Sequence, residues 1–272
     1  MRYADLHLHS TFSDGLLTPV ALAQACAEQN LDICCLTDHD TIGGYTEFAA
    51  ACASLQIETF PGIELSTKFK DTGFHILGYG FDVSHGALNA HLNDAAENRE
   101  SRVGKILEKL DLQGISLEES ELAARGKGSR YGRPQIADAM VEKGYVASFT
   151  EAFDRYLGTD GTAYVPYYKI DALHAIALIH AAGGTAIIAH PGLQNRDELV
   201  KKLIGEGIDG IEIIHPEHPD ELVVHYTAMA TTHNVLVTGG SDYHARPQDL
   251  DHLGKFKIAE SKVIEFLKAA RD

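Results

Sequence analysis

Histidines and carboxylates recur at or just beyond the ends of short apolar runs in this chain. Asp5, His7 and His9 alternate along the first run, so they face the same side of a strand. A lone His-x-His is a weak signal, but the same residue types follow or lie in other runs. The candidate metal ligands are His7, His9, Asp14, His39, Glu64, His75, His190, Asp242 and His244. A coincidental set of solvated side chains is the alternative.

These nine candidate ligands are imidazoles and carboxylates, without a thiolate among them. One tetrahedral catalytic site uses about three protein groups, so the set predicts two or three divalent ions. Mixed nitrogen and oxygen ligands suit manganese, which we expect, with zinc or iron as alternatives. Clustered ions activate a water as hydroxide, polarise a phosphoryl oxygen and neutralise a leaving oxygen. Phosphate ester hydrolysis fits these roles.

The elements that must position these ligands are short strands alternating with helical patterns. Seven strands are predicted: Tyr3–Leu8, Ile33–Thr37, Gln56–Pro61, Phe74–Gly78, Thr185–Ala189, Gly210–Ile214 and Val235–Thr238. Thr18-Pro19 opens a helix through Gln29, and Asp171 opens one that stops at Gly183-Gly184. The alternation indicates an α/β fold with a mainly parallel sheet or barrel. Barrel enzymes place their chemistry at the carboxyl ends of the strands, where the candidate ligands lie.

Residues 84–169 are too long for a simple crossover between strands, and their pattern is almost wholly helical. We therefore predict a barrel formed by residues 1–83 and 170–272, with 84–169 as an inserted helical subdomain that caps the site. The segment from Arg125 to Arg133 contains four cationic residues and no acid. Lys127, Arg130 and Arg133 are predicted to bind an anion, with Arg133 just before the predicted helix Pro134–Glu142. A solvated glycine-rich loop with incidental charge is the alternative.

The overall charge limits the kinds of partner. The chain of 272 residues has 23 Lys and Arg against 39 Asp and Glu, a net charge of −16. Such an acidic protein is not expected to bind duplex DNA through a broad basic surface. Bound metal ions would invert the potential locally and admit a phosphate.

Cysteine spacing and hydropathy indicate in which cellular compartment the protein is expected. The four cysteines, Cys26, Cys34, Cys35 and Cys52, show no C-x-x-C spacing and are predicted to be reduced core thiols. The longest apolar stretch, residues 175–189, contains His180 and Gly183-Gly184, so no membrane span or membrane partner is expected. Without a secretory pattern at the start, we expect a cytoplasmic protein. The oligomeric state stays open.

The ordered motifs resemble those of the polymerase and histidinol phosphatase (PHP) superfamily. They are His7-x-His9, Ser13-Asp14-Gly15, Thr37-Asp38-His39-Asp40, Gly62-Ile63-Glu64, Ala189-His190-Pro191 and Ser241-Asp242-Tyr243-His244. The resemblance implies a distorted seven-stranded (β/α) barrel with a multinuclear phosphoesterase site. It also implies three ligand sets: His7, His9, Glu64 and Asp242; Glu64, His75 and His190; and Asp14, His39 and His244, with Glu64 bridging the ions of the first two.

Arg133-Pro134 and the run from Ile179 to Gly192 are similar to one branch of that superfamily. Members of this branch act on nucleoside 3′,5′-bisphosphates, and related members trim short RNA from the 5′ end. Gln135 departs from the branch, which often has histidine there. The resemblance thus implies a phosphatase that removes the 3′-phosphate of a nucleoside bisphosphate, with the basic segment holding the 5′-phosphate.

Three further points stay open at this stage. His190, His218 or a metal-bound water would serve as general acid. His215 lies where it would contact substrate or simply face solvent. The alternative functions are another PHP phosphatase, such as one acting on histidinol phosphate, a polymerase-associated proofreading domain, and a non-catalytic metal-binding module.

Overall fold

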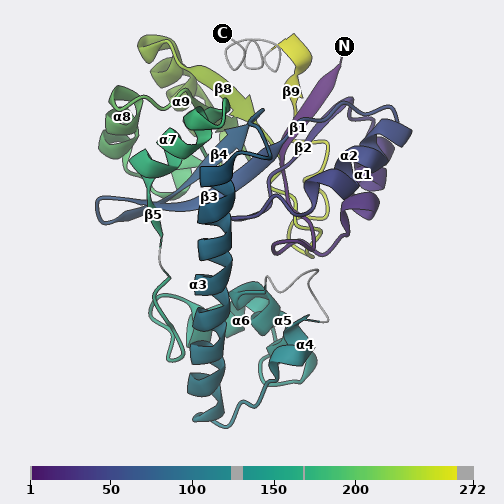
Figure 1. Cartoon of the computed structure of the whole chain (residues 1–272), viewed down its shortest axis with the longest axis vertical. Coiled ribbons are helices and arrows are strands. Elements are labelled where there is room, and N and C mark those ends of the chain that lie inside the picture. The colour runs from purple at the N-terminus through teal and green to yellow at the C-terminus, as the bar shows by residue number, and fades with distance from the viewer. Residues whose placement is uncertain (1, 124–130, 168, 262–272) are drawn as a thin grey trace.

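The computed structural model describes residues 2–123, 131–167 and 169–261 (Figure 1). Its strands are β1 (Tyr3–Leu8), β2 (Ile33–Leu36), β3 (Gly62–Phe69), β4 (Thr72–Tyr79), β5 (Ile170–Asp171), β6 (Thr185–Ile188), β7 (Gly210–Ile214), β8 (Leu236–Gly239) and β9 (Ile258–Ala259). Its helices are α1 (Pro19–Glu28), α2 (Tyr45–Ser54), α3 (Gly86–Asp111), α4 (Glu119–Ala123), α5 (Arg133–Glu142), α6 (Phe149–Ala152), α7 (Ala172–Ala181), α8 (Asp197–Gly205) and α9 (Asp220–His233), with short turns η1 (Phe153–Leu157) and η2 (Pro191–Leu193).

The strands form two sheets, ordered β2-β1-β9 and β5-β3-β4-β6-β7-β8. Pairs β1–β2, β6–β7 and β7–β8 are parallel, whereas β4 runs antiparallel to both β3 and β6. The isolated bridges Leu8↔Tyr243 and His39↔Glu64 connect the two sheets, and Ile33↔Glu58 pairs β2 with the segment before β3. The structure therefore confirms a mixed α/β fold with parallel strands, while a closed barrel stays a prediction.

The predicted third strand, Gln56–Pro61, is wrong. Gln56 has a positive φ of 60° just after α2, and Glu58 makes only an isolated bridge with Ile33. Pro61 has no N–H to donate, so the continuous strand starts at Gly62. A Cβ on Gly62 would lie 2.3 Å from Cys35 Sγ, so glycine permits the close approach of β2 and β3. Glu64 consequently lies within β3 rather than after the third strand.

The predicted helix starts are confirmed. The Thr18 side chain accepts a hydrogen bond from Ala21 N at the start of α1, and Asp171 accepts one from Leu173 N at the start of α7. Helix α7 ends before Gly183, whose φ of +76° suits glycine. Figure 1 shows α7, α8 and α9 beside the larger sheet and α1 and α2 beside the smaller one.

The helices after β4 pack around a hydrophobic cluster of their own. Helix α3 extends away from the sheets, and α4, α5 and α6 gather beside its far half (Figure 1). The buried members of this cluster include Val103, Ile106, Leu110, Ile136, Met140 and Leu157. The arrangement is in keeping with the predicted helical insertion, and the division of the chain at residues 84 and 169 stays a prediction.

All four cysteines are buried and reduced. Cys26, Cys34 and Cys52 pack in the cluster between α1, α2 and the smaller sheet, as core thiols were predicted to do. In the part of the chain that the structure describes, we find no helix with the length and hydropathy needed to cross a membrane.

Candidate metal centre and substrate pocket

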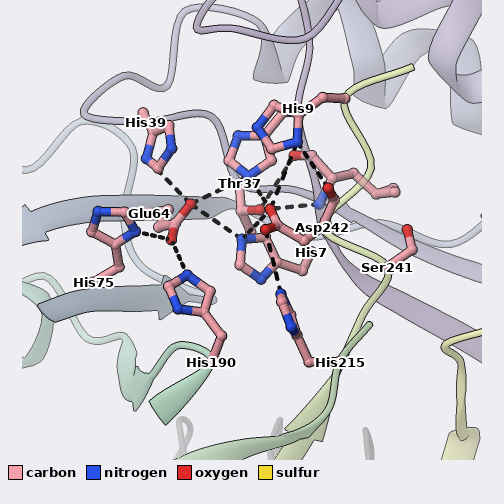
Figure 2. Close-up of polar contacts among 12 residues, drawn as sticks. His7, His9, Thr37, His39, Glu64, His75, His190, His215, Ser241 and Asp242 are labelled. Carbon is pink, nitrogen blue, oxygen red and sulfur yellow. Dashed lines mark hydrogen bonds and ion pairs between the residues drawn. The ribbon is translucent and has the colours of Figure 1, made fainter. Parts of the chain in front are cut away.

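Glu64, in the middle of β3, is the carboxylate on which the site converges (Figure 2). Its side chain is only 1% exposed. Five histidine nitrogens lie close to its two oxygens: around Oε2, His7 Nε2 at 3.1 Å, His9 Nε2 at 3.2 Å and His39 Nδ1 at 3.2 Å, and around Oε1, His75 Nδ1 at 2.7 Å and His190 Nε2 at 3.1 Å. The antiparallel strand β4 supplies His75, and the ends of β1, β2 and β6 supply the others.

Asp242 is the second shared carboxylate and lies just after β8 (Figure 2). Its Oδ1 is 3.2 Å from His7 Nε2 and 3.1 Å from His9 Nε2. Both Asp242, with φ 48°, and His190, with φ 28°, adopt a left-handed backbone. For residues other than glycine this conformation is strained and is concentrated at functional sites. His7, His9, Glu64 and Asp242 form one cluster that could hold an ion, the same set that the resemblance implies.

Asp14 forms the third part of the site. Its Oδ1 is 3.2 Å from His244 Nε2, and its Oδ2 is 3.9 Å from His39 Nε2. The His9 and His244 rings stack with centroids 4.1 Å apart. The structure groups His9, Asp14, His39 and His244, which adds His9 to the predicted third set, and it groups His39 with Glu64 and His75. All nine predicted ligands therefore lie together, with Glu64 central.

Several buried ring nitrogens of this site face carboxylates without forming hydrogen bonds. Among the described residues, none makes a hydrogen bond with His9 Nε2, His39 Nδ1 or His75 Nδ1, although each lies within 3.2 Å of a Glu64 oxygen. The lone pairs of these histidine nitrogens converge on shared carboxylates. A cation bound between them would satisfy both groups, whereas a hydrogen bond does not form. The residues therefore fit divalent metal ions with nitrogen and oxygen ligands.

The electrostatics of the cluster keep its carboxylates ionised. Burial raises the pKa of Glu64, but His39, His75 and His7 outweigh it and hold that pKa well below its usual value. Burial lowers the pKa of His9, but Asp242 and Glu64 raise it to about 10. Burial dominates at His39, whose pKa falls to about 4. A buried set of anionic oxygens needs positive charge close by, which metal ions or protons provide.

Two residues around this cluster were missed or left open by the sequence reasoning. Glu212, fully buried in β7, contacts His7; its only sequence signal is a single acid inside an apolar strand. His215 is 2% exposed, and its Nε2 lies 3.3 Å from Asp242 Oδ2, so it faces the site rather than solvent.

His218 lies at the edge of the site and has both ring nitrogens engaged by the backbone. Its Nδ1 is 2.9 Å from the Ile213 carbonyl oxygen, and its Nε2 accepts a hydrogen bond from Gly192 N at 3.0 Å. In this tautomer Nδ1 donates and Nε2 accepts. This arrangement favours a structural role for His218 over the predicted role as general acid.

A cavity of about 230 Å³ connects the candidate ligands to a cationic wall. Three candidate ligands, Asp14, His39 and His75, are part of its lining. The remaining lining includes four cationic side chains, Arg99, Arg102, Arg133 and Lys169, together with Tyr164 and Tyr167. Burial and the neighbouring Arg133 lower the pKa values of Arg102, to about 10, and of Lys169. Crowded, partly desolvated cations of this kind favour an anionic ligand.

Arg133 is the predicted anion-binding residue that the structure places in this cavity. It begins α5, donates a hydrogen bond to the Leu157 carbonyl at 3.0 Å and stacks against Phe153. The predicted partners Lys127 and Arg130 lie outside the described residues. Sequence reasoning missed Arg99, Arg102 and Lys169, because they come from separate segments and no local charge run marks them.

Gln135, which departs from the related branch, has a structural role here. Its Oε1 accepts a hydrogen bond from Gly132 N, and its Nε2 donates one to the Ser13 carbonyl at 2.7 Å. It therefore fixes the start of α5 against the loop that carries Asp14.

Comparison with known proteins identifies the family. A family model described as the PHP domain matches residues 5–161. The chain belongs to the PHP domain family. A 5′-3′ exoribonuclease of Haemophilus influenzae is 36% identical over 245 residues, covering 88% of this chain and 89% of the relative. A 3′,5′-nucleoside bisphosphate phosphatase of Chromobacterium violaceum is 33% identical over 258 residues, covering 90% and 88%.

Solved structures agree with this assignment. The crystal structure of a metal-dependent phosphoesterase from Bifidobacterium adolescentis superposes on this PHP protein with a TM-score of 0.89 at 29% identity, covering 97% of this chain and 95% of that one. Family and relatives together place this PHP protein among the phosphoesterases, and its histidine and carboxylate clusters could hold metal ions.

Proposed function

We propose that this PHP protein hydrolyses the 3′-phosphate of nucleoside 3′,5′-bisphosphates, giving the 5′-monophosphate and inorganic phosphate. One observation carries the proposal: a single cavity is lined both by three candidate metal ligands and by four cationic side chains, of which Arg99 is paired with Asp40. A substrate with two phosphates fits two anion-binding walls. A substrate with one phosphate, such as histidinol phosphate, leaves the second wall without a role.

In the proposed complex the protein's residues hold the two phosphates apart. Arg102, Arg133 and Lys169 bind the 5′-phosphate, since a guanidinium fork matches phosphate oxygens. The tyrosine rings beside the arginines bound the space between the two ends. Divalent ions held by the nine ligands would supply Lewis acidity and an activated water at the 3′ ester.

Among the predicted proton donors, His190 is the one that borders the carboxylate cluster. Its Nε2 lies 3.1 Å from Glu64 Oε1, and it also belongs to the proposed ligand set. His218 is excluded from this role in the proposal because both its nitrogens are engaged by the backbone. Because a ligating nitrogen carries no proton, His190 cannot serve as ligand and proton donor at once, and protonation of the leaving 3′ oxygen is assigned to water in this proposal.

The same geometry extends to RNA. A 5′-phosphorylated RNA end presents a 5′-phosphate and a 3′ ester at the same separation as the bisphosphate. The protein therefore also releases 5′-mononucleotides from short RNA in the proposed function. The relatives named 5′-3′ exoribonuclease favour this second activity.

The test is phosphate release with manganese from adenosine 3′,5′-bisphosphate, run beside 3′-AMP, 5′-AMP and histidinol phosphate. We expect the bisphosphate to be cleaved to 5′-AMP with the highest kcat/KM. Preference for histidinol phosphate would contradict the role of the cationic wall. Manganese binding without turnover of any substrate would favour a non-catalytic module. A parallel assay with 5′-phosphorylated and 5′-hydroxyl RNA tests the exonuclease activity.

A further inference from the structure

Glu212 is a buried carboxylate that the proposed chemistry does not use. It lies in the middle of β7 and is fully buried. Its Oε1 is 2.9 Å from His7 Nδ1, and its Oε2 accepts a hydrogen bond from His190 N at 2.8 Å. One carboxylate therefore links two candidate ligands, from the end of β1 and the end of β6.

The contact with His7 sets which of its nitrogens is available to a metal. His7 Nε2 faces Glu64 Oε2 and Asp242 Oδ1, at 3.1 and 3.2 Å. A ligating nitrogen is unprotonated, so the proton of neutral His7 must lie on Nδ1 and point to Glu212 Oε1. Carboxylate partners of this kind fix the tautomer and the ring orientation of metal-binding histidines.

The contact between Glu212 and His190 involves the backbone amide of His190 rather than its ring. His190 adopts φ 28° and ψ 57°, a left-handed conformation just after β6. The hydrogen bond from its amide to Glu212 Oε2 holds this turn, which directs the ring toward Glu64. The His7 and His190 rings stack with centroids 5.8 Å apart.

We infer that Glu212 is a positioning residue: it fixes His7 through the ring proton on Nδ1 and His190 through the backbone amide. In this position Nε2 of each histidine faces the metals. The inference rests on the proposed metal site. Glu212 also lies near His7 and His215 in a cluster that could itself hold an ion. Both of its oxygens, however, already accept from donors, which favours positioning over ligation.

Glu212→Gln is the sharpest test, because both partners are donors and a carboxamide has only one acceptor oxygen. Its NH₂ must face either His7 Nδ1–H or His190 N–H. We expect manganese to bind roughly 10- to 100-fold more weakly, with full stoichiometry at saturation. Binding is measured by calorimetry without substrate, so the result does not depend on which ester is cleaved.

Asp209→Asn is the matched control. Asp209 Oδ2 also bridges a histidine nitrogen and a strand amide, His180 Nε2 and Ala186 N, both at 2.7 Å, but at the opposite end of β6. The Asp209→Asn variant should bind manganese with the same affinity as the wild type. Unchanged affinity in Glu212→Gln would overturn the inference, and so would loss of one whole ion at saturation, since that is the behaviour of a ligand.

A second measurement keeps the inference testable if Glu212→Gln does not fold. In the zinc-loaded wild-type protein, nitrogen-15 NMR of the imidazoles should show a slowly exchanging proton on His7 Nδ1. A proton that is absent or exchanges as fast as in solvent-exposed histidines would contradict the hydrogen bond to Glu212.

Discussion

Glu64 is the side chain through which most of the candidate ligands interact. Five histidine nitrogens lie within 3.2 Å of its two oxygens, and it connects all parts of the site. Replacement by glutamine removes one acceptor oxygen and the negative charge but keeps the shape. The result therefore reports on charge and ligation rather than on packing.

For Glu64→Gln we expect turnover to fall by about 100-fold or more and manganese content to fall with it, since the anionic oxygen shared between ions is lost. Elemental analysis after gel filtration, with phosphate release on the same sample, checks both quantities. Glu108→Gln, on an exposed position of α3, is the control. Full metal content together with full activity in Glu64→Gln would contradict the assigned centre.

Arg133 tests the second anion site. Charge-assisted hydrogen bonds to phosphate contribute about 1.5–3 kcal/mol, so Arg133→Ala should raise KM for adenosine 3′,5′-bisphosphate by roughly 10- to 100-fold. KM for 3′-AMP should not change, because that substrate has no 5′-phosphate. Arg133→Lys keeps the charge and should recover part of the affinity. An equal rise in KM for both substrates would show that Arg133 supports the fold of the insertion instead.

Residue types and spacing were enough to predict the nine candidate ligands, since each lies in or near a recognisable apolar strand. Glu212 could not be found in this way, because a single acid inside β7 looks like a surface residue until its neighbours are known. The same applies to Arg99 and Lys169, which come from segments far apart in the sequence and meet at one cavity.

At the level of elements, strand ends approach one another closely where the two sheets meet. Gly240 follows β8 and lies against β1: a Cβ there would lie 2.4 Å from both the nitrogen and Cβ of His7. No rotamer change relieves a clash with the backbone. The absence of a side chain at this position thus sets how near β8 comes to the first two histidines.

Gly240→Ala should destabilise the protein by about 1–3 kcal/mol through overpacking and weaken manganese binding, because β1 must move away from Asp242. Urea unfolding and metal titration measure the two effects. Gly205→Ala in α8 is the control: a Cβ there meets nothing within 4 Å, and alanine favours a helix. Equal stability of the two variants would contradict the close approach of the strands.

Element boundaries were predicted less well than element types. Six of the seven predicted strands match observed ones within a few residues, whereas Gln56–Pro61 precedes the real third strand. That run has strand-like composition but contains a residue with positive φ and ends on proline. The antiparallel direction of β4 follows from its two-residue connection to β3 at Lys70 and Asp71, which hydropathy does not reveal.

For the whole molecule, the buried ligands make stability depend on metal. An ion that binds only the folded state stabilises it by about 2.7 kcal/mol at 100 times its Kd. For a chain of this size we expect manganese to raise Tm by roughly 5–10 °C over the chelator-treated protein. Calorimetry across a manganese titration measures the shift. A Tm that does not respond to manganese would mean that the nine residues bind no ion in the folded state.

The metal centre joins distant parts of the chain. His7 and His9 come from the first strand, whereas Asp242 and His244 follow β8, and Leu8 and Tyr243 form the bridge that brings them together. During synthesis the first histidines therefore leave the ribosome more than two hundred residues before the aspartate that completes their site. A nascent chain that stops short of Asp242 and His244 holds only part of the ligand set, so loading with metal, and with it the capacity to cut phosphate esters, waits until those two residues have been made.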